Sequence, residues 1–374
     1  MGITRLGNVT GLDHIGIPVA IAVRPNSCSV SVCQGKGLTL DQAFASAMME
    51  AVEQFHGEDI AGRFRLSSYH DLAVRSRVVD PTGLAGNGTP FDPAKEIHWI
   101  EGYDLLHRES CWVPAEIVHT DYTLKPRPDS GAFLRGTNGL ASGNNVAEAL
   151  SAAICEAVER DAASLWGAQP LQSRSLRWLD IASVDDADCR WLLDRFAAAG
   201  IGVRVWVVTS DIGIPAFVCD IRETSDDPRL GTRRFRGAGC HPDRAIALAR
   251  ALSEAAQTRL TYIVGSRDDL PLSDYDAPAN ADLSEALLDV LQAAGTPGLF
   301  REIPSCTSDD IAEDVVWELD RLRSVGVNRV IAVDLTRPEF GIPVLRVVIP
   351  GLEGDCRNAE YVPARRARVM AGVR

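Results

Sequence analysis

The chain has 374 residues, and 46% of them are hydrophobic, enough to bury one large or two ordinary cores. Its formal net charge of -13 repels nucleic-acid phosphates, and no basic stripe interleaved with aromatic residues offsets it, which argues against DNA or RNA binding. No run of ~18 apolar residues and no signal-peptide pattern occur, which predicts a cytoplasmic chain that does not enter a membrane. The nine cysteines include no Cys-x-x-Cys pair, so we expect reduced thiols.

Periodicity predicts strands and helices in mixed order. The first two strands, at 14–23 and 28–33, are joined by a turn, and a capping box of Thr39 and Gln42 opens the first helix, which ends near Gly57. Further strands are expected at 97–106, 111–118, 201–208, 214–221, 328–335 and 343–349. Further helices are expected at 145–166, 186–199, 242–263, 282–293 and 308–325.

This order has no clean βαβ rhythm, and no low-complexity linker divides the chain. We therefore predict a mixed α/β fold in a single domain over residues 1–374. The stretch at 266–284 is rich in Asp and Pro and is expected to be a flexible loop within that domain.

A short helical pattern occurs three times, as SAMMEAVEQF (46–55), AAICEAVERD (152–161) and RALSEAAQTR (250–259). The copies are about 100 residues apart, too far for a solenoid repeat. On a helical wheel, each copy places polar groups on one face and apolar groups on the other. The three polar faces hold Ser46, Glu50 and Glu53; Asn144, Glu148, Glu156 and Glu159; and Arg250, Glu254 and Gln257.

A solvated amphipathic helix shows the same pattern, and for one helix alone that is the commoner explanation. Solvated faces usually pair Glu with Lys at i, i+4, however, and these hold almost no Lys. Carboxylates that converge at low dielectric repel one another unless a cation neutralises them. Mg²⁺ is suited to that role because it prefers carboxylate and phosphate oxygens.

The sequence therefore predicts a site for ATP and Mg²⁺ that uses no P-loop, since the motif G-x-x-x-x-G-K-[ST] is absent. Arg160 and Arg250 are candidate phosphate clamps. Lys36, between two glycines, can reach a phosphate or lie in water as a turn residue. The candidate magnesium ligands are Glu50, Glu53, Glu148, Glu156, Glu159 and Glu254.

Three long segments carry a resemblance to a known family. The segments at 35–55, 139–161 and 239–260 resemble the signature blocks of the YcaO family, in the family's order and at about its spacing. The likeness continues through DLTRPEFGIPVLRVVIPGLE (334–353). The resemblance implies the family's α/β fold, in which three acidic helices converge on a nucleotide site.

The resemblance also implies a reaction, in which the oxygen of a peptide amide attacks the γ-phosphate of ATP and a nucleophile then adds to the amide carbon. Phosphorylation turns a poor leaving group into a good one. The family's ATP positions match Ser46, Asn144, Arg160, Arg250 and Gln257, with Lys36 as a further candidate, and its magnesium positions match the six glutamates named above. Catalytic residues are not assigned.

The carboxyl-terminal sequence bears on the product. Azoline-forming members typically end in a proline-rich tail, whereas RNAEYVPARRARVMAGVR (357–374) contains Pro363 alone. It is more similar to members that work with a TfuA partner and a sulfur donor to install backbone thioamides in ribosomally made peptides or proteins. Azoline formation and macroamidine formation remain alternatives, as does a non-catalytic nucleotide-binding accessory protein. The oligomeric state is open, a homodimer included.

Overall fold

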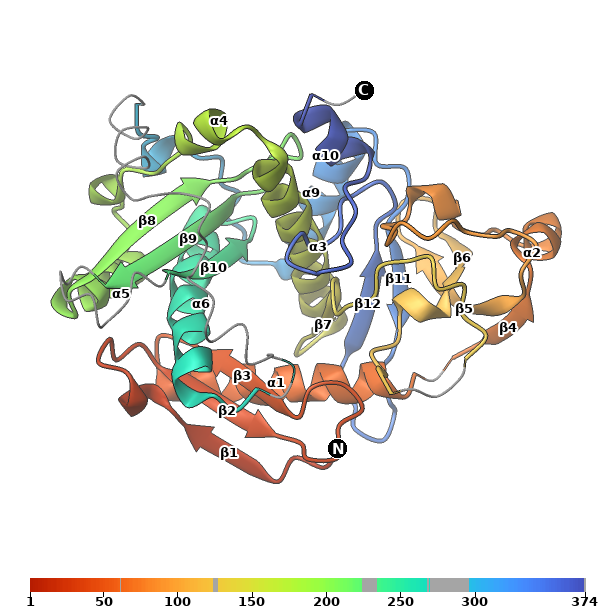
Figure 1. Ribbon diagram of the computed structural model, residues 1–374, viewed down its shortest axis with the longest axis horizontal. Helices are drawn as coiled ribbons and strands as arrows, with labels where there is room; N and C mark the ends of the chain where they lie inside the picture. Colours follow the sequence, from red (N-terminus) through yellow and green to blue (C-terminus); the bar gives the residue numbers. More distant parts are fainter. Residues whose placement is uncertain (61, 124–126, 224–233, 268, 270–295, 373–374) are drawn as a thin grey trace. The chain divides into compact units, whose positions relative to one another are not determined.

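The computed structural model describes residues 1–60, 62–123, 127–223, 234–267, 269 and 296–372 (Figure 1). The chain divides into two compact units, and the boundary between them falls inside helix α1 (Leu40–Glu58). Unit 1 comprises Met1–Asn26, Val30–Ala51 and Gln169–Thr307, and unit 2 comprises Ser27–Ser29, Val52–Ala168 and Ser308–Arg374. The predicted helix at 282–293 and nearly all of the predicted loop at 266–284 lie outside the described residues.

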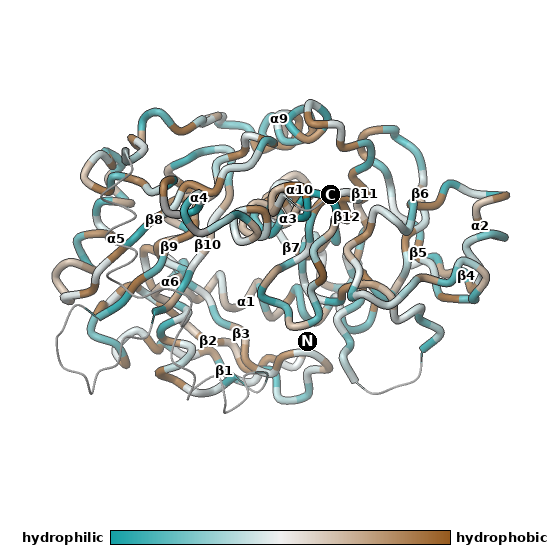
Figure 2. Tube along the Cα trace, turned by 45° about the horizontal axis from the view of Figure 1, so that its top comes forward, coloured by the Kyte–Doolittle hydropathy of each residue, from teal (hydrophilic) through white to brown (hydrophobic). Residues whose placement is uncertain are grey.

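The first sheet of unit 1 is antiparallel and has the order β1 (Arg5–Asn8), β2 (Val19–Val23), β3 (Val32–Lys36). Side chains alternate across β2, so its two faces bury different residues. Ala20 and Ala22 pack with the buried alanines of α1, and Val19 and Ile21 pack with Leu260 of α6 (Arg244–Val264). In Figure 2, β2 is drawn mostly in the brown of hydrophobic residues.

The second sheet of unit 1 has the order β10 (Arg234–Cys240), β9 (Ala216–Glu223), β8 (Ile201–Val207) and is also antiparallel. Helices α5 (Ala187–Ala198) and α6 join it in one hydrophobic core, which contains the fully buried Phe196 and Phe217. A short helix, α4 (Leu171–Ser175), precedes this part of the chain.

Unit 2 contains a six-stranded sheet in which all pairings are antiparallel. Its strands are β4 (Phe64–Ser67), β5 (Ile97–Asp104), β6 (Glu109–Pro114), β7 (Leu140–Ser142), β11 (Ile331–Asp334) and β12 (Val344–Val348). Helix α3 (Val146–Ala168) packs on β7 and β12, and α9 (Ile311–Ser324) and α10 (Arg365–Met370) pack on α3. Helix α2 (Tyr69–Arg75) follows β4.

The capping box at the start of α1 is confirmed, because Gln42 N donates to Thr39 Oγ1 at 3.3 Å and Thr39 N donates to Gln42 Oε1 at 3.2 Å. The three pattern-bearing helices lie within two residues of their predicted ends. The strand predicted at 28–33 is wrong in its bounds, since β3 runs from Val32 to Lys36. Gly35 lies within this strand and lets α1 approach closely.

Candidate functional site

In both units, a glycine in a strand or directly after one comes against a pattern-bearing helix. A Cβ atom on Gly35 of β3 would lie 2.0 Å from Ala47 N of α1, and one on Gly237 of β10 would lie 2.2 Å from Ala251 O of α6. Within unit 2, a Cβ atom on Gly143 after β7 would lie 2.6 Å from Ala149 N of α3. Only glycine fits at such distances, so strand and helix meet backbone to backbone.

In unit 1, this packing brings Lys36 and Glu254 together. Lys36 Nζ, at the end of β3, lies 2.9 Å from Glu254 Oε2 of α6. The other carboxylate oxygen of Glu254 accepts a hydrogen bond of 3.4 Å from Ala238 N of β10. The sequence allows two alternatives for Lys36, a phosphate contact or a solvated turn position. In the structure, Lys36 instead pairs with Glu254, a predicted magnesium ligand.

Glu50, on α1, interacts electrostatically with both Lys36 and Glu254. Burial raises its pKa from 4.5 to about 7, although Arg267, Lys36 and a backbone hydrogen bond from Gln34 oppose the rise, and Glu254 adds to it. A carboxyl group with a pKa near neutrality is costly to ionise without a further cation. From the sequence we expected carboxylates that repel one another, whereas desolvation is the largest cause of this shift and Glu254 is the smallest.

Two other predicted residues of unit 1, Arg250 and Gln257, donate long hydrogen bonds to backbone carbonyl oxygens. Arg250 Nη1 donates to Cys240 O at 3.2 Å, and Gln257 Nε2 donates to Gln34 O at 3.4 Å. Ser46 lies on α1, one turn before Glu50. In unit 1 the structure thus brings Lys36, Glu50 and Glu254 into mutual electrostatic contact.

In unit 2, two predicted glutamates bind the loop and strand before α3. Glu53 Oε1 accepts hydrogen bonds from Ser142 N at 2.8 Å and Ser142 Oγ at 2.6 Å. Glu148 Oε2 accepts from Asn144 N at 3.0 Å and from Asn144 Nδ2 at 2.9 Å. These contacts hold the amino-terminal end of α3 through acidic side chains that were predicted as metal ligands.

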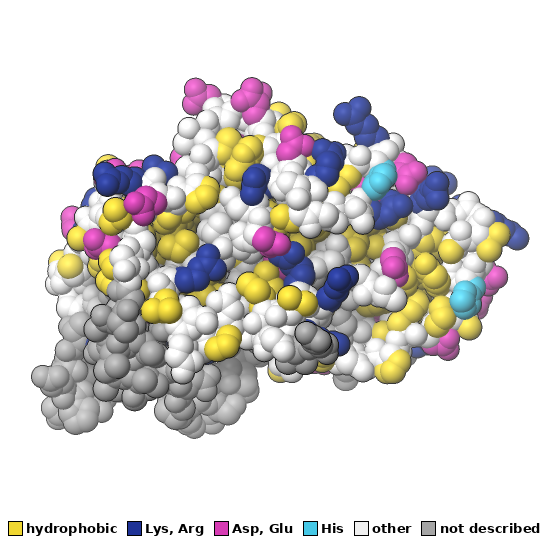
Figure 3. Space-filling view, turned by 90° about the horizontal axis from the view of Figure 1, so that it is seen from above, with side chains coloured by type: hydrophobic (Ala, Val, Ile, Leu, Met, Phe, Trp, Pro, Cys, Tyr) yellow, Lys and Arg dark blue, Asp and Glu magenta, His cyan; other side chains and the backbone are white. Residues whose placement is uncertain are grey.

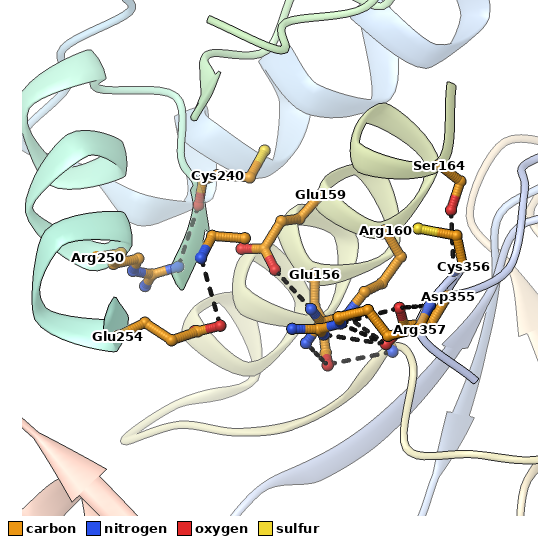
Figure 4. Close-up of polar contacts among 12 residues, drawn as sticks. Glu156, Glu159, Arg160, Ser164, Cys240, Arg250, Glu254, Asp355, Cys356 and Arg357 are labelled. Carbon is orange, nitrogen blue, oxygen red and sulfur yellow. Dashed lines mark hydrogen bonds and ion pairs between the residues drawn. The ribbon is translucent and has the colours of Figure 1, made fainter. Parts of the chain in front are cut away.

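Arg160 lies among carboxylates further along α3 (Figure 4). Its guanidinium nitrogens lie 3.3 Å from Glu156 Oε1, 3.0 Å from Glu159 Oε1 and 3.7 Å from Asp355 Oδ2. Arg357 in turn pairs with Asp355 at 3.0 Å. Burial raises the pKa of Glu156, and Arg160 and Arg346 oppose that rise.

Sequence reasoning missed Arg346, on β12. Its side chain is 4% exposed, and Nη2 donates to Gly136 O at 2.9 Å. Nε and Nη1 are buried and have no hydrogen-bond partner within the described residues. Buried guanidinium groups are normally fully bonded, so these two N–H groups call for an acceptor. The only signal available was one arginine in an otherwise apolar strand.

Asp355 and Arg357 were also missed. They follow the strand in the sequence GLEGDCR, and Asp355 reaches Arg160 from a position nearly 200 residues away along the chain. Sequence spacing carries no signal for such a pair. Within the described ranges, no three His, Cys, Asp or Glu side chains gather into a metal-binding group. The assignment of six glutamates to magnesium therefore remains a prediction.

The close glycine contacts, the acidic helix faces and the ion-paired arginines all lie within a mixed α/β fold. A family described as YcaO cyclodehydratase, ATP- and Mg²⁺-binding, matches residues 34–353. The chain belongs to the YcaO family.

Two relatives are similar over nearly the whole chain. A Rhizobium leguminosarum bv. trifolii protein, named only by its place in the tfuA 3' region, is 36% identical over 96% of this chain and 86% of its own length. An uncharacterised protein of Methanothermobacter thermautotrophicus is 35% identical over 98% of this chain and 93% of its own.

Solved structures confirm the YcaO-type fold. A heterocyclase in complex with substrate and cofactor has a TM-score of 0.78 at 23% identity, over 94% of this chain and 50% of the heterocyclase, so this chain spans half of that protein. YcaO from Methanopyrus kandleri, bound with AMPPCP and Mg²⁺, has a TM-score of 0.67 at 23% identity, over 94% of this chain and 86% of that one. Among the described residues, none of the helices has the length and apolar character needed to span a bilayer.

Proposed function

We propose that this protein uses ATP and Mg²⁺ to phosphorylate the oxygen of a peptide backbone amide. Buried Arg346 beside Glu156 carries the proposal. Two of its guanidinium nitrogens lack an acceptor within the described residues, and a phosphate oxygen is the kind of acceptor that a buried guanidinium binds best. The family description and the AMPPCP and Mg²⁺ bound to the Methanopyrus protein support the same ligands.

In this proposal, one set of residues binds the phosphates of ATP and another binds Mg²⁺. Arg160, Arg250 and Lys36 supply positive charge for phosphate oxygens, with Ser46, Asn144 and Gln257 as polar contacts. Glu50, Glu53, Glu148, Glu156, Glu159 and Glu254 are the proposed magnesium ligands. When bound, the metal would neutralise charge on the transferred phosphoryl group.

The raised pKa values of Glu50 and Glu156 are consistent with carboxyl groups that bind a cation. Glu50 and Glu156 both have raised pKa values because burial disfavours their charge. A divalent cation reverses that preference and holds each carboxyl group ionised. The residues present therefore fit both ATP and Mg²⁺.

For the product, we propose a backbone thioamide, formed when a sulfur nucleophile adds to the activated amide carbon and phosphate leaves. The position of the Rhizobium relative in the tfuA 3' region supports a TfuA-like partner that delivers sulfur. The tail with Pro363 as its single proline supports the same subgroup. A peptide or protein is the substrate, and a homodimer is one of the assemblies that fits.

Mass spectrometry of the substrate tests the proposal. Genes beside this one supply candidate peptides, each to be incubated with the protein, ATP, Mg²⁺, sulfide and a TfuA-like partner. Replacement of one oxygen by sulfur raises the peptide mass and supports thioamidation. Loss of water instead supports an azoline or amidine product. ATP binding without any change in peptide mass, across all neighbouring candidates, supports the accessory protein.

A further inference from the structure

A groove in unit 2 is lined by none of the predicted ATP or magnesium residues. It has a volume of about 580 Å³ and separates the loop before β5 from the carboxyl-terminal segment. The lining residues used below are Gly86, Gly88, Val362, Arg365, Arg368 and Val369. On the face drawn in Figure 3, Lys and Arg side chains stand among hydrophobic ones.

One wall of the groove carries an isolated β-bridge. Gly86 forms an antiparallel bridge with Phe133, flanked by hydrogen bonds from Leu134 N to Ala85 O (2.9 Å) and from Asn87 N to Ala132 O (3.1 Å). Backbone groups of successive strand residues point to opposite sides, so those of Gly86 face away from this partner. Neither Gly86 nor Gly88 makes a backbone hydrogen bond within the described part of the chain.

The opposite wall is the carboxyl-terminal segment from Val362 to Val369. It is positively charged and is held in place by hydrogen bonds to Glu353 and Asp161. The chain contains no Asp or Glu after Glu360, although its net charge is -13. Glu353, which is 1% exposed, accepts hydrogen bonds of 2.8 Å from Tyr361 Oη, Ala364 N and Ala367 N. Arg366 donates two hydrogen bonds of 3.0 Å to Asp161 of α3.

The side chains of Arg365 and Arg368 are available to bind an acidic ligand. Both are exposed and line the groove, and neither forms an ion pair with any residue that the structure describes. Arg368 Nε donates to Pro363 O at 2.9 Å, which directs its side chain along the segment. Val362 and Val369, 38% and 67% exposed, add apolar surface beside these charges.

We infer that this groove binds an extended acidic segment of the substrate polypeptide, away from the amide that reacts. The segment pairs through its backbone with the Gly86 edge, places carboxylates on Arg365 and Arg368, and sets small apolar side chains against the two valines. Glycine at 86 leaves the backbone open to such pairing. The identity of the occupant rests on the proposed function, because it is the polypeptide to be modified.

The test uses a fluorescein-labelled decapeptide of alternating Glu and Val, with fluorescence polarisation on the full chain at low salt and without ATP or Mg²⁺. We expect saturable binding that weakens about tenfold in the double variant Arg365→Glu, Arg368→Glu and weakens again as salt is added. Arg323→Glu on α9 is the matched control, since Arg323 is exposed and pairs only locally with Asp320. It should bind the probe as the unchanged protein does.

Two altered probes separate backbone pairing from charge alone. A decapeptide with N-methyl groups on alternate amides keeps its charges but cannot pair as a strand, so it should bind much more weakly. A Lys and Val decapeptide should not bind. Equal binding by the double variant, or by the N-methylated probe, would overturn the inference.

Parallel measurements keep the two proposals distinct. Melting temperatures show whether the double variant is folded, and its ATP-dependent change of peptide mass is recorded beside the binding data. Absence of probe binding with intact peptide modification overturns the groove assignment alone. Probe binding through Arg365 and Arg368 without any peptide modification upholds the groove and overturns the proposed function.

Discussion

Single carboxyl groups in this protein are held in environments that penalise their charge. Glu50 is the clearest case, because burial outweighs the lysine and arginine nearby and lifts its pKa to about 7. Glu156 follows the same trend, with two arginines acting against the burial. Both side chains are partly buried, whereas acidic side chains on a fully solvated helix face are exposed, which favours a ligand-binding interpretation of the polar faces.

The raised pKa of Glu50 predicts a pH-dependent effect of Glu50→Gln. An acid whose pKa rises on folding costs no stability below its unfolded pKa of 4.5, and the cost grows until the pH passes the folded value of about 7. The metal-free variant should therefore match the unchanged protein at pH 4.5 and exceed it by about 2–3 kcal/mol at pH 8. Urea unfolding at both pH values measures this. A variant that is less stable at pH 8 would show that Glu50 is structural.

Arg160 forms ion pairs with three carboxylates, so its removal should destabilise unit 2. We expect Arg160→Ala to lower the free energy of unfolding by about 1–3 kcal/mol at pH 8, because Glu156 and Glu159 lose a buried partner. Arg323→Ala removes an exposed ion pair and should cost less than about 0.5 kcal/mol. Similar effects of the two changes would mean that the cluster around Arg160 is solvated.

Strand and helix in this protein meet at glycines, and these contacts set the position of the acidic faces. Gly35 and Gly237 admit helix backbone where any side chain would collide. Lys36 and Ala238, each next to such a glycine, are consequently the residues that contact Glu254. The glycines thereby determine which part of each helix faces its strand.

Gly237→Ala should therefore destabilise unit 1. Its new Cβ atom would lie 2.2 Å from Ala251 O and 2.3 Å from Ala255 N, both backbone atoms that cannot rotate away. We expect a loss of about 1–3 kcal/mol or more in thermal or urea unfolding. Gly11→Ala is the control, because a Cβ atom there meets nothing within 4 Å, and it should stay within about 0.5 kcal/mol. Equal effects would mean that α6 is free to shift.

Binding of ATP and Mg²⁺ to the whole protein can test the proposed ligands. At a free concentration of ~100 times Kd, ATP with Mg²⁺ should raise the free energy of unfolding by about 2.7 kcal/mol. Excess chelator should remove the effect, since the triphosphate would otherwise meet uncompensated carboxylates.

Variants assign this ligand effect to residues of each unit. Glu50→Gln and Glu254→Gln change unit 1, and Glu159→Gln changes unit 2. Each should abolish the ligand-induced rise in melting temperature. In the metal-free protein, Glu50→Gln should be at least as stable as before, whereas Glu254→Gln and Glu159→Gln give up ion pairs with Lys36 and Arg160 and should lose up to about 1 kcal/mol. If two of the three variants keep the full rise, the polar faces are solvated faces and not metal ligands.

The sequence by itself determined the class of this protein. Helical periodicity, the capping box at Thr39 and Gln42 and the three repeated segments are local patterns, so α1, α3 and α6 could be predicted nearly to their ends. The resemblance of those segments led to the YcaO family, which the matched residues 34–353 confirm. Strands β1, β4 and β10 were missed, because β1 and β4 are mostly exposed and β10 contains two glycines, so none of them shows a clear apolar alternation.

Only the tertiary structure decided which charges meet. The pairing of Lys36 with Glu254, and that of Arg160 with Asp355, joins residues about 200 positions apart in sequence, where spacing carries no information. The burial of Arg346 and the raised pKa of Glu50 likewise arise from desolvation by surrounding elements, a property of packing and not of residue type. Local sequence specifies which groups a helix face presents, and the packing of helix on strand specifies what those groups contact.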